Sequence, residues 1–353
     1  MSNKTGISWT DATWNPIRGC SRVSEGCRNC YAERVAVRFC GPGMPYEGLA
    51  NPIAPRDLMD RVGGRRGGWT REVRMVPEHL ADPLRWRKPR RIFVNSMSDL
   101  FHEALTNEQI AAVFGVMAAA PQHTFQVLTK RAKRMREWFA WLLAGEVSPS
   151  GKCFEAARGT VDFGSWYRTV PQQWPLPNVW LGVSVENQAA ANERIPELLA
   201  TPAAVRFLSC EPLIGDVALS GVLVPLEGGG HDVLAALAGL RWGARRDLPP
   251  GMHLIGARGP SIDWVIAGCE SGPGARPCDV AWLRSLRDQC IDADVPFFLK
   301  QARVSAETSA DPSDGVVRPA IRAGIASNTK PGGVIELPYL DGVQWAEFPA
   351  VPR

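Results

Sequence analysis

Short apolar segments rich in β-branched residues alternate with longer amphipathic segments along most of the chain. Apolar runs of strand length predict strands at Ile92–Asn95, Phe125–Leu128, Val179–Val185, Val205–Ser209, Trp264–Ala267 and Pro296–Leu299. Segments with helical periodicity predict helices at Tyr31–Phe39, Asn107–Ala119, Ala132–Leu143, Gln188–Leu199 and Val280–Ile291. The order of strand then helix indicates a mostly parallel sheet with crossover helices.

This pattern predicts the α/β class and a partial (β/α) TIM-like barrel with long loop insertions. A doubly wound open sheet is the alternative. We expect the barrel to occupy residues 1–301, with insertions at about 41–90, 146–176 and 218–261, where the periodicity is weak. Residues 302–353 form a C-terminal extension in this prediction.

Polar residues follow the predicted strands at their carboxyl ends. Parallel α/β enzymes place their chemistry at this edge of the sheet. Any one of these residues also fits a helix cap or a turn, but the same placement recurs after all of the predicted strands. The residues are Ser96, Ser98, Asp99, Thr129, Lys130, Ser184, Glu186, Ser209, Glu211, Gly268, Glu270, Ser271, Lys300 and Gln301.

The composition is ordinary for a globular protein, with 353 residues, 45% of them hydrophobic, and a formal net charge of +4. The segment from Arg56 to Arg91 is more basic, with 11 Lys and Arg against 5 Asp and Glu. Basic patches attract polyanions, although a solvated surface explains them equally well. Trp9, Trp14 and Trp69 lie near this segment or the first cysteines and would stack unpaired bases. Core packing is the expectation for other tryptophans, Trp138, Trp141 and Trp264.

The first residues, Met1–Lys4, lack the apolar region of a secretory signal. No stretch approaches ~20 uninterrupted apolar residues, so the sequence predicts no membrane span. We therefore expect a cytoplasmic protein with no membrane partner. In a reducing compartment, clustered cysteines indicate metal binding or catalysis more often than disulfides.

Three of the nine cysteines form a C-x6-C-x2-C pattern directly before a predicted helix: Cys20, Cys27 and Cys30. Three thiolates on one loop are able to hold three irons of a [4Fe-4S] cluster. The fourth iron would then be open to S-adenosylmethionine (SAM). A zinc site is the alternative, because structural zinc takes four Cys or His ligands and Cys40 follows in the sequence. Three unrelated thiols are the remaining interpretation.

Several segments together resemble the phage-associated Gp37/Gp68-like family (DUF5131), which is similar to a divergent, photolyase-like branch of the radical SAM superfamily. The resemblance covers about residues 7–301, with a further match at Leu340–Trp345. The segments that carry it are Cys27–Glu33, Asn95–Phe101, Leu128–Arg131, Leu181–Glu186, Leu208–Leu213 and Gly268–Gly272. The common superfamily spacing is C-x3-C-x2-C, so the longer first gap of this chain changes the path of the loop.

The resemblance implies a [4Fe-4S] cluster on the three cysteines and SAM as cosubstrate. By position, Ser96, Ser98 and Asp99 match the segment that contacts the SAM amino group. Ser184 and Glu186 match the segment that contacts the ribose and carboxylate. Lys130 would pair with the SAM carboxylate or a substrate phosphate. A helix N-cap is the alternative role for Asp99, and a solvated side chain is the alternative for Lys130.

Cys210, Glu211 and Glu270 are the candidate catalytic residues. A thiol at a strand end, Cys210 or Cys269, would donate a hydrogen atom to a substrate radical, although a buried cysteine more often serves as a small hydrophobic residue. A carboxylate that ends an apolar strand is costly unless it is used. Glu211 and Glu270 are therefore expected to bind a substrate amine or to transfer protons. No partner is identifiable for His102 or His123.

These features, with the resemblance, predict a radical SAM enzyme that modifies a nucleobase. The most specific hypothesis is isomerisation of N-linked to C-linked glycyl-thymidine in phage DNA hypermodification, in the bacterial host cytoplasm. The predicted partners are DNA or a modified nucleotide as substrate and a reductase as electron donor. One alternative is a photolyase-like radical SAM repair enzyme. The other is a non-enzymatic four-cysteine zinc module that binds nucleic acid.

Overall fold

The computed structural model describes residues 5–52, 67–161, 173–227, 229–244, 251–272, 274–303, 334–336, 339–341 and 343–350. They divide into two compact units, which are described separately. The N-terminal unit lies within residues 1–180 and 202–204. The C-terminal unit lies within residues 181–201 and 205–353.

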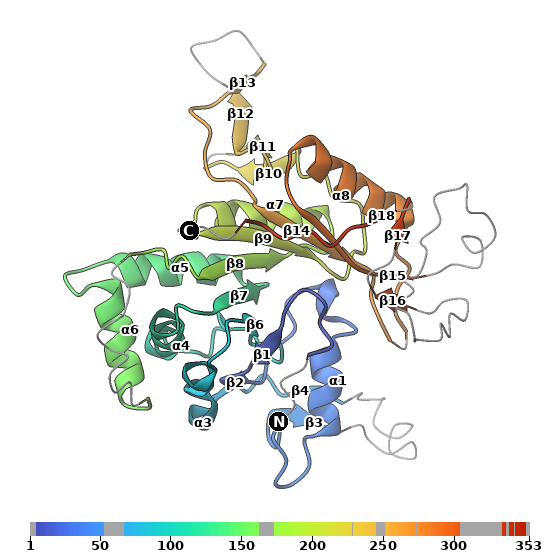
Figure 1. Ribbon diagram of the computed structural model, residues 1–353. Helices are drawn as coiled ribbons and strands as arrows, with labels where there is room; N and C mark the ends of the chain where they lie inside the picture. The colour runs from blue at the N-terminus through green and yellow to red at the C-terminus, as the bar shows by residue number, and fades with distance from the viewer. Residues whose placement is uncertain are drawn as a thin grey trace. The chain divides into compact units, whose positions relative to one another are not determined.

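Three parallel strands form the centre of the N-terminal unit (Figure 1): β1 (Ala12–Trp14), β6 (Arg91–Val94) and β7 (Thr124–Thr129). Ile92 on β6 pairs with Ala12 on β1 and with Phe125 on β7. The sequence predicted β6 and β7 but missed β1. A strand of three residues carries too little alternation to be recognised, and its pairing partner lies about 80 residues away in the chain.

Three helices follow these strands in the N-terminal unit: α4 (Asn107–Ala119), α5 (Ala132–Leu143) and α6 (Pro149–Arg158). α4 begins with a capping box, in which Thr106 accepts from the Gln109 backbone and the Gln109 side chain accepts from the Thr106 backbone. α4 packs closely against α6, since a Cβ on Gly115 would lie 2.6 Å from the Cys153 carbonyl oxygen. α6 lies in the stretch that was predicted to be an insertion.

Short elements surround the N-terminal part of this unit. Helix α1 covers Tyr31–Arg38, and the strand pairs are β2 (Ile17–Arg18) with β5 (Arg74–Met75) and β3 (Ala50–Asn51) with β4 (Gly68–Trp69). The single-turn elements are η1 (Glu25–Cys27), α3 (Pro77–Leu80) and η2 (Asp82–Arg85). Of these elements, β3, β4, β5, α3 and η2 occupy part of the predicted insertion at 41–90. Residues 53–66 of that insertion lie outside the described residues.

The C-terminal unit is built around β9 (Val205–Cys210), β14 (Trp264–Gly268) and β15 (Phe297–Arg303). β14 pairs in parallel with both neighbours, and β16 (Val334–Glu336) adds antiparallel to β15. Helix α7 (Gln188–Leu199) precedes β9, and helix α8 (Val280–Asp292) connects β14 to β15. Asn187 and Asp279 cap the two helices with their side chains, which explains why the sequence predicted both starts correctly.

The strand order of the largest sheet is β1-β6-β7-β8-β9-β14-β15-β16, where β8 (Val179–Ser184) contains the boundary between the units. The seven strands from β1 to β15 are parallel. Every residue of β8 is buried, as is usual for a strand of a parallel sheet. The fold is therefore mixed α/β with an open, half-barrel parallel sheet, which confirms the predicted class.

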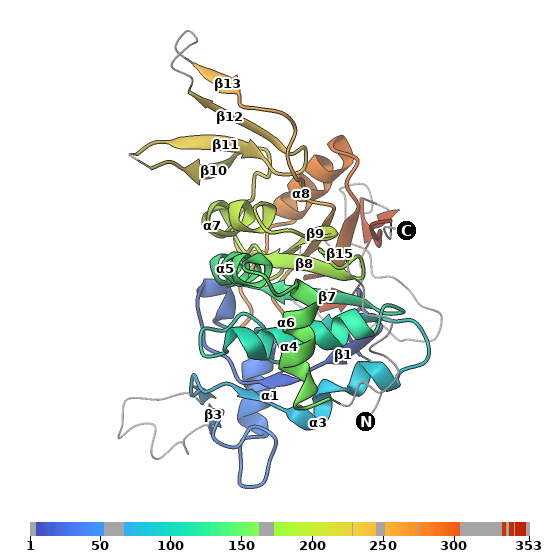
Figure 2. The same ribbon diagram turned by 90° about the vertical axis from the view of Figure 1, so that its left-hand side faces the viewer.

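A second, antiparallel sheet fills the predicted insertion at 218–261 (Figure 2): β10 (Val222–Pro225), β11 (His231–Ala235), β12 (Leu240–Ala244) and β13 (Met252–Leu254). Its strands pair in sequence order. The segment starts and ends beside one residue, because the Ala236 amide donates to the Leu219 carbonyl and the Ala236 carbonyl accepts from the Ile262 amide. The sequence did not predict this sheet.

The described part of the predicted C-terminal extension joins the C-terminal unit. The Leu299 amide donates to the Trp345 carbonyl, and the Trp264 indole donates to the Glu347 carbonyl at 2.9 Å. A short hairpin, β17 (Tyr339–Leu340) with β18 (Val343–Gln344), precedes this contact. Residues 304–333 of the extension lie outside the described residues.

The tryptophans near the first cysteines pack mainly in the interior. Trp9 and Trp14 are both 2% exposed, and the Trp14 indole donates to the His79 carbonyl at 2.7 Å. The idea that these two rings stack bases is therefore wrong, because a base could not reach them. Trp69 is half-buried beside Tyr46. Trp138 and Trp264 are fully buried, as predicted, while Trp141 is half-buried.

Candidate functional site

The loop that carries the three cysteines begins at Gly19. The backbone of Gly19 has φ +93°, and a Cβ there would lie 2.1 Å from the Glu72 carbonyl oxygen. Only glycine fits both the left-handed backbone and this approach. Gly19 also forms a parallel bridge with Ser98, just past β6. This bridge places Cys20 beside the carboxyl end of a central strand.

The three cysteines share one electrostatic environment. Cys20, Cys27 and Cys30 are each partly exposed, with Cys27 at the end of η1 and Cys30 immediately before α1. Burial raises the pKa of Cys20 to about 12, with further contributions from Asp99 and from the two other thiols, while Arg131 opposes the shift. Burial also raises the pKa of Cys30, opposed by the backbone amides at the start of α1 and by Lys130. The thiolates of Cys20 and Cys30 would therefore be stabilised by Arg131 and Lys130, respectively, which follow β7.

Within the described ranges there is no group of three or more Cys, His, Asp or Glu side chains placed to hold one metal ion. The ligands of a zinc ion must all meet at that ion, whereas the ligands of a four-iron cluster bind different irons. Thiol donors with cations beside them fit a cluster on these cysteines.

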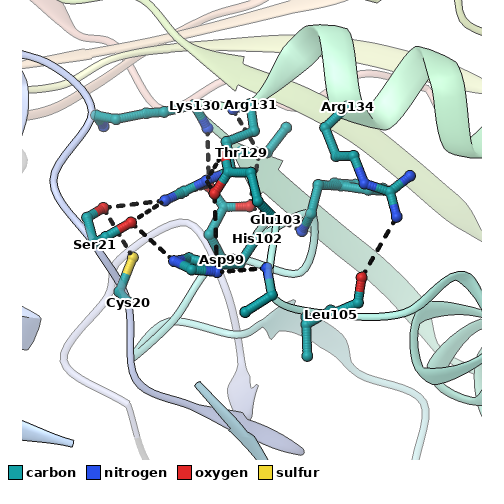
Figure 3. A network of polar contacts seen from close by, with 12 residues as sticks. Cys20, Ser21, Asp99, His102, Glu103, Leu105, Thr129, Lys130, Arg131 and Arg134 are labelled. Atoms are coloured by element: carbon teal, nitrogen blue, oxygen red, sulfur yellow. Dashed lines mark hydrogen bonds and ion pairs between the residues drawn. The ribbon is translucent and has the colours of Figure 1, made fainter. Parts of the chain in front are cut away.

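Asp99 is the centre of a buried network beside this loop (Figure 3). Its Oδ1 accepts from the Phe101 amide at 3.0 Å and the Thr129 hydroxyl at 2.7 Å. Its Oδ2 accepts from the Lys130 amide at 3.2 Å and Arg131 Nη1 at 3.1 Å. A carboxylate offers about four lone-pair positions, so these four donors fill them. The structure places Asp99 as an internal organiser of the strand ends, and contact with the SAM amino group would require one donor to leave.

Arg131 connects this network to the cysteine loop. Its side chain is 4% exposed and contacts three partners: Asp99, Glu103 and Ser21. Its Nη2 donates to the Ser21 carbonyl at 3.1 Å and to the Ser21 hydroxyl oxygen at 2.8 Å. Ser21 directly follows Cys20. The sequence indicated Arg131 only within the segment Leu128–Arg131 that carries the family resemblance, because its partner is 110 residues away.

His102 completes the same network, although the sequence offered no partner for it. The Ala104 amide donates to His102 Nδ1 at 3.1 Å, so the proton of the neutral ring lies on Nε2. Nε2 then donates to the Ser21 hydroxyl oxygen at 2.8 Å. Burial lowers the pKa of His102, with Arg131 adding to the effect. In this tautomer His102 is a donor to Ser21 and cannot act as its base.

The predicted serines after β6 hold the segment that precedes Cys20. The Ser96 hydroxyl donates to Asn15 Oδ1 at 3.2 Å, and the Ser98 hydroxyl donates to the Ile17 carbonyl at 2.9 Å. The Tyr31 hydroxyl, next to Cys30, donates to the Ser96 carbonyl at 2.5 Å. The strand end and both ends of the cysteine loop are thus joined by hydrogen bonds.

Glu33 ties the loop to α1 and β4, and the sequence did not indicate it. Its carboxylate is 7% exposed and forms an ion pair with Arg22, which lies in the gap between Cys20 and Cys27. Glu33 Oε1 also accepts from the Trp69 amide at 3.0 Å. The signals in the sequence were an acid one turn after Cys30 and its place in the segment Cys27–Glu33 that carries the family resemblance.

The predicted acids of the C-terminal unit each have a basic partner. Glu186 pairs with Arg194 at 2.7 Å, and Arg194 also donates to the Ser184 carbonyl at 2.8 Å. Two more such pairs lie at strand ends, Glu211 with Lys300 and Glu270 with Arg276. A ligand at any of these sites would therefore contact a carboxylate whose charge is already offset by a basic side chain.

Cys210 and Cys269 are buried in the C-terminal unit. Burial raises the pKa of Cys210, with Cys290 adding to the effect. The Cys269 carbonyl accepts from the Gln301 side chain at 2.7 Å. Full burial fits a packing role for both thiols, while hydrogen-atom donation stays a prediction.

The structure therefore gathers one set of predicted residues within the N-terminal unit: Cys20, Cys27, Cys30, Ser96, Ser98, Asp99 and Lys130. Another set belongs to the C-terminal unit: Ser184, Glu186, Cys210, Glu211 and Glu270. Among the described helices, none has the length and apolar character needed to cross a bilayer.

The protein is therefore an α/β protein with a half-barrel parallel sheet, and a loop with three cysteines is held at the strand ends. The model of one family, described as a protein of unknown function (DUF5131), matches residues 4–349. The chain belongs to that family. No curated protein and no solved structure matches it.

Proposed function

We propose that this protein is a radical SAM enzyme whose [4Fe-4S] cluster is held by Cys20, Cys27 and Cys30. The observation that carries the proposal is the placement of these thiols on one loop, at the carboxyl ends of β6 and β7, within electrostatic reach of one another. Arg22, Lys130 and Arg131 lie close enough to offset thiolate charge. A cluster bound there would supply the electron for reductive cleavage of SAM.

The residues around the loop have separable roles in this proposal. Lys130 supplies a cation near Cys30 for the SAM carboxylate or a substrate phosphate. Ser96 and Ser98 keep oxygen lone pairs for the SAM amino group, since their hydroxyls act as donors to the protein. Asp99 orients Lys130 and Arg131 through its hydrogen bonds. Ser184 and Glu186 belong to the C-terminal unit, where both are buried and Glu186 is paired with Arg194, so they have no part in this proposal.

We propose a nucleobase as the substrate, and specifically glycyl-thymidine in DNA, which the enzyme would isomerise from the N-linked to the C-linked form. The basic segment from Arg56 to Arg91 and the family resemblance support a polyanionic substrate. Glu211 and Glu270, each paired with a cation, would bind the amino-acid substituent or move protons.

Anaerobic purification and reconstitution test the class of enzyme. We expect about four irons and four sulfides per chain and formation of 5′-deoxyadenosine from SAM after reduction. C20S, C27S and C30S should each lose the cluster, whereas C40S should keep it. One zinc per chain and loss of that zinc in C40S would replace the proposal with the four-cysteine module.

The substrate is tested with the reconstituted protein. Incubation with SAM, a reductant and DNA that contains glycine-substituted thymidine should give an isomer of unchanged mass in a nucleoside digest. Formation of 5′-deoxyadenosine without this isomer would contradict the substrate but not the class. Reversal of a photolesion in irradiated DNA would then identify the photolyase-like repair enzyme.

A further inference from the structure

The gap between Cys20 and Cys27 contains two consecutive residues whose side chains bind partners on different elements. Ser21 contacts the network at the ends of β6 and β7, and Arg22 contacts α1. A gap of six residues leaves more conformational freedom than a shorter one, and closing it costs entropy. Contacts that restrict the gap therefore have a direct effect on where Cys20 lies.

The first anchor is made by Arg131 and His102 on Ser21. The Ser21 hydroxyl oxygen accepts from Arg131 Nη2 and from His102 Nε2, both at 2.8 Å. The Ser21 carbonyl accepts from Arg131 Nη2 and from the Cys20 thiol at 3.5 Å. Arg131 is itself held by the buried carboxylate of Asp99. A planar guanidinium with fixed donors can make these contacts at once, whereas an ammonium cannot reproduce the fork.

The second anchor is made by Glu33 on Arg22. Arg22 Nε donates to both Glu33 oxygens, at 3.2 Å and 3.0 Å, and its Nη2 makes a third contact. Glu33 is itself fixed on α1 and by the Trp69 amide. A Cβ on Gly68 would lie 2.9 Å from Glu33 Oε1, so the backbone of β4 closely covers the carboxylate. Arg22 is half exposed, but its partner has little room to move.

We propose that Arg131 and Glu33 are positioning residues that hold the Cys20–Cys27 gap in its cluster-binding conformation before the cluster arrives. The inference rests on the proposed function for the nature of the ligand. The two anchors act on adjacent residues from different elements, so neither alone fixes the loop.

The first experiment follows the loop in the full-length, metal-free chain by hydrogen–deuterium exchange of the peptide that spans residues 18–30. R131K keeps the positive charge but loses the planar set of guanidinium donors. E33Q keeps the shape of the side chain but loses its negative charge. Each should speed exchange of this peptide by about tenfold, the effect of losing one charge-assisted hydrogen bond. R134M is the matched control, because Arg134 lies three residues further along, in α5, and contacts Leu105 and Asn107 instead.

The second experiment measures the reconstituted protein. R131K and E33Q should release iron to a chelator faster than the wild type, and the electron paramagnetic resonance spectrum of the reduced cluster should broaden. E103Q should change neither property. It removes a contact of Arg131 Nε to a carboxylate that is 63% exposed and does not touch the loop. S21A, which loses the acceptor of two hydrogen bonds, should resemble R131K and decides the question if R131K does not fold.

The outcomes separate the inference from the proposed function. A wild-type protein that binds the cluster, with R131K, S21A and E33Q releasing iron at the wild-type rate, overturns the inference and leaves the function standing. A wild-type protein that binds no iron overturns the proposed function. If the variants also exchange peptide 18–30 at the wild-type rate, the inference that Arg131 and Glu33 restrict this loop is overturned as well.

Discussion

Each unit contains a buried Asp or Glu beside a strand end that is paired with an arginine, and the two pairs differ in what they connect. Asp99 and Arg131 in the N-terminal unit are 8% and 4% exposed, and Glu186 and Arg194 in the C-terminal unit are 2% and 3% exposed. Arg194 contacts only the strand and helix next to it along the chain, among the partners that the structure describes. Arg131 reaches Ser21 in the cysteine loop.

A buried pair of a carboxylate and an arginine therefore has a different consequence in each unit. A buried pair between neighbouring residues stabilises one strand–helix junction. A buried pair between distant segments makes the position of a loop depend on the sheet. Removing one partner of either pair leaves an uncompensated buried charge, which costs about 3–5 kcal/mol, so stability alone does not distinguish them. The conformational freedom of the cysteine loop distinguishes the two pairs.

The largest effect is expected for D99N and E186Q. Each variant leaves a buried arginine without its carboxylate and should lower the free energy of unfolding by about 3 kcal/mol. Only D99N should also speed hydrogen exchange in residues 18–30, because only Asp99 holds the arginine that binds Ser21. Chemical denaturation and exchange on the same samples check this. Equal exchange in the two variants would abolish the contrast between the pairs.

G19A should come next, with a loss of about 2–3 kcal/mol. The substitution combines a strained backbone with a clash against the Glu72 carbonyl. G48A is the matched control, because Gly48 also has positive φ, +75°, but no atom lies within 4 Å of its Cβ position. That control should lose only about 1 kcal/mol. Thermal unfolding of both variants measures the difference, and equal losses would show that the approach to Glu72 does not matter.

T106A should lower stability by about 1 kcal/mol through loss of the capping box on α4. This variant weakens the N-terminal unit without touching the cysteine loop. Exchange in residues 18–30 should therefore remain at the wild-type rate, in contrast to D99N. Faster exchange there would mean that the loop follows the general stability of the unit and not its own anchors.

The smallest effect concerns pH and Asp341 in the C-terminal unit. Burial alone would raise the pKa of Asp341, but hydrogen bonds from Arg284 and Arg287 outweigh it and lower the pKa below the ordinary value. Ionised Asp341 therefore stabilises the fold above pH about 4, and this contribution is lost as the pH falls through the lowered pKa. Because the site is one-third exposed, less than about 1 kcal/mol is involved. D341N should lower stability at pH 7 and flatten its acid dependence, as followed by thermal unfolding between pH 3 and 7.

The sequence predicted the elements that local chemistry determines. Helices α4 and α7 begin where Thr106 and Asn187 cap them, and the central apolar strands lie where their residues predicted. Capping and apolar runs are read within a few residues, so one sequence is enough. The start of α6 was readable in the same way, since Ser148 caps it and Pro149 follows, but weak periodicity concealed it.

Non-local contacts explain what the sequence did not indicate. The predicted cysteines, Lys130 and Asp99 do meet near the same strand ends, but the role of Asp99 depends on Arg131, and that of Arg131 depends on Ser21. His102 looked unpartnered for the same reason. Strand β1 and the sheet β10–β13 were missed because their strands are short and are fixed by pairing, which no local pattern records.

The antiparallel sheet β10–β13 leaves and rejoins its unit at two points that both bond to Ala236. Its strands pair in sequence order, so the segment is a self-contained insertion whose two ends lie close together. A chain that shortens or exchanges this insertion need not reroute the parallel strands on either side. A change of length in this segment should therefore leave the pairing of β9 with β14 unchanged.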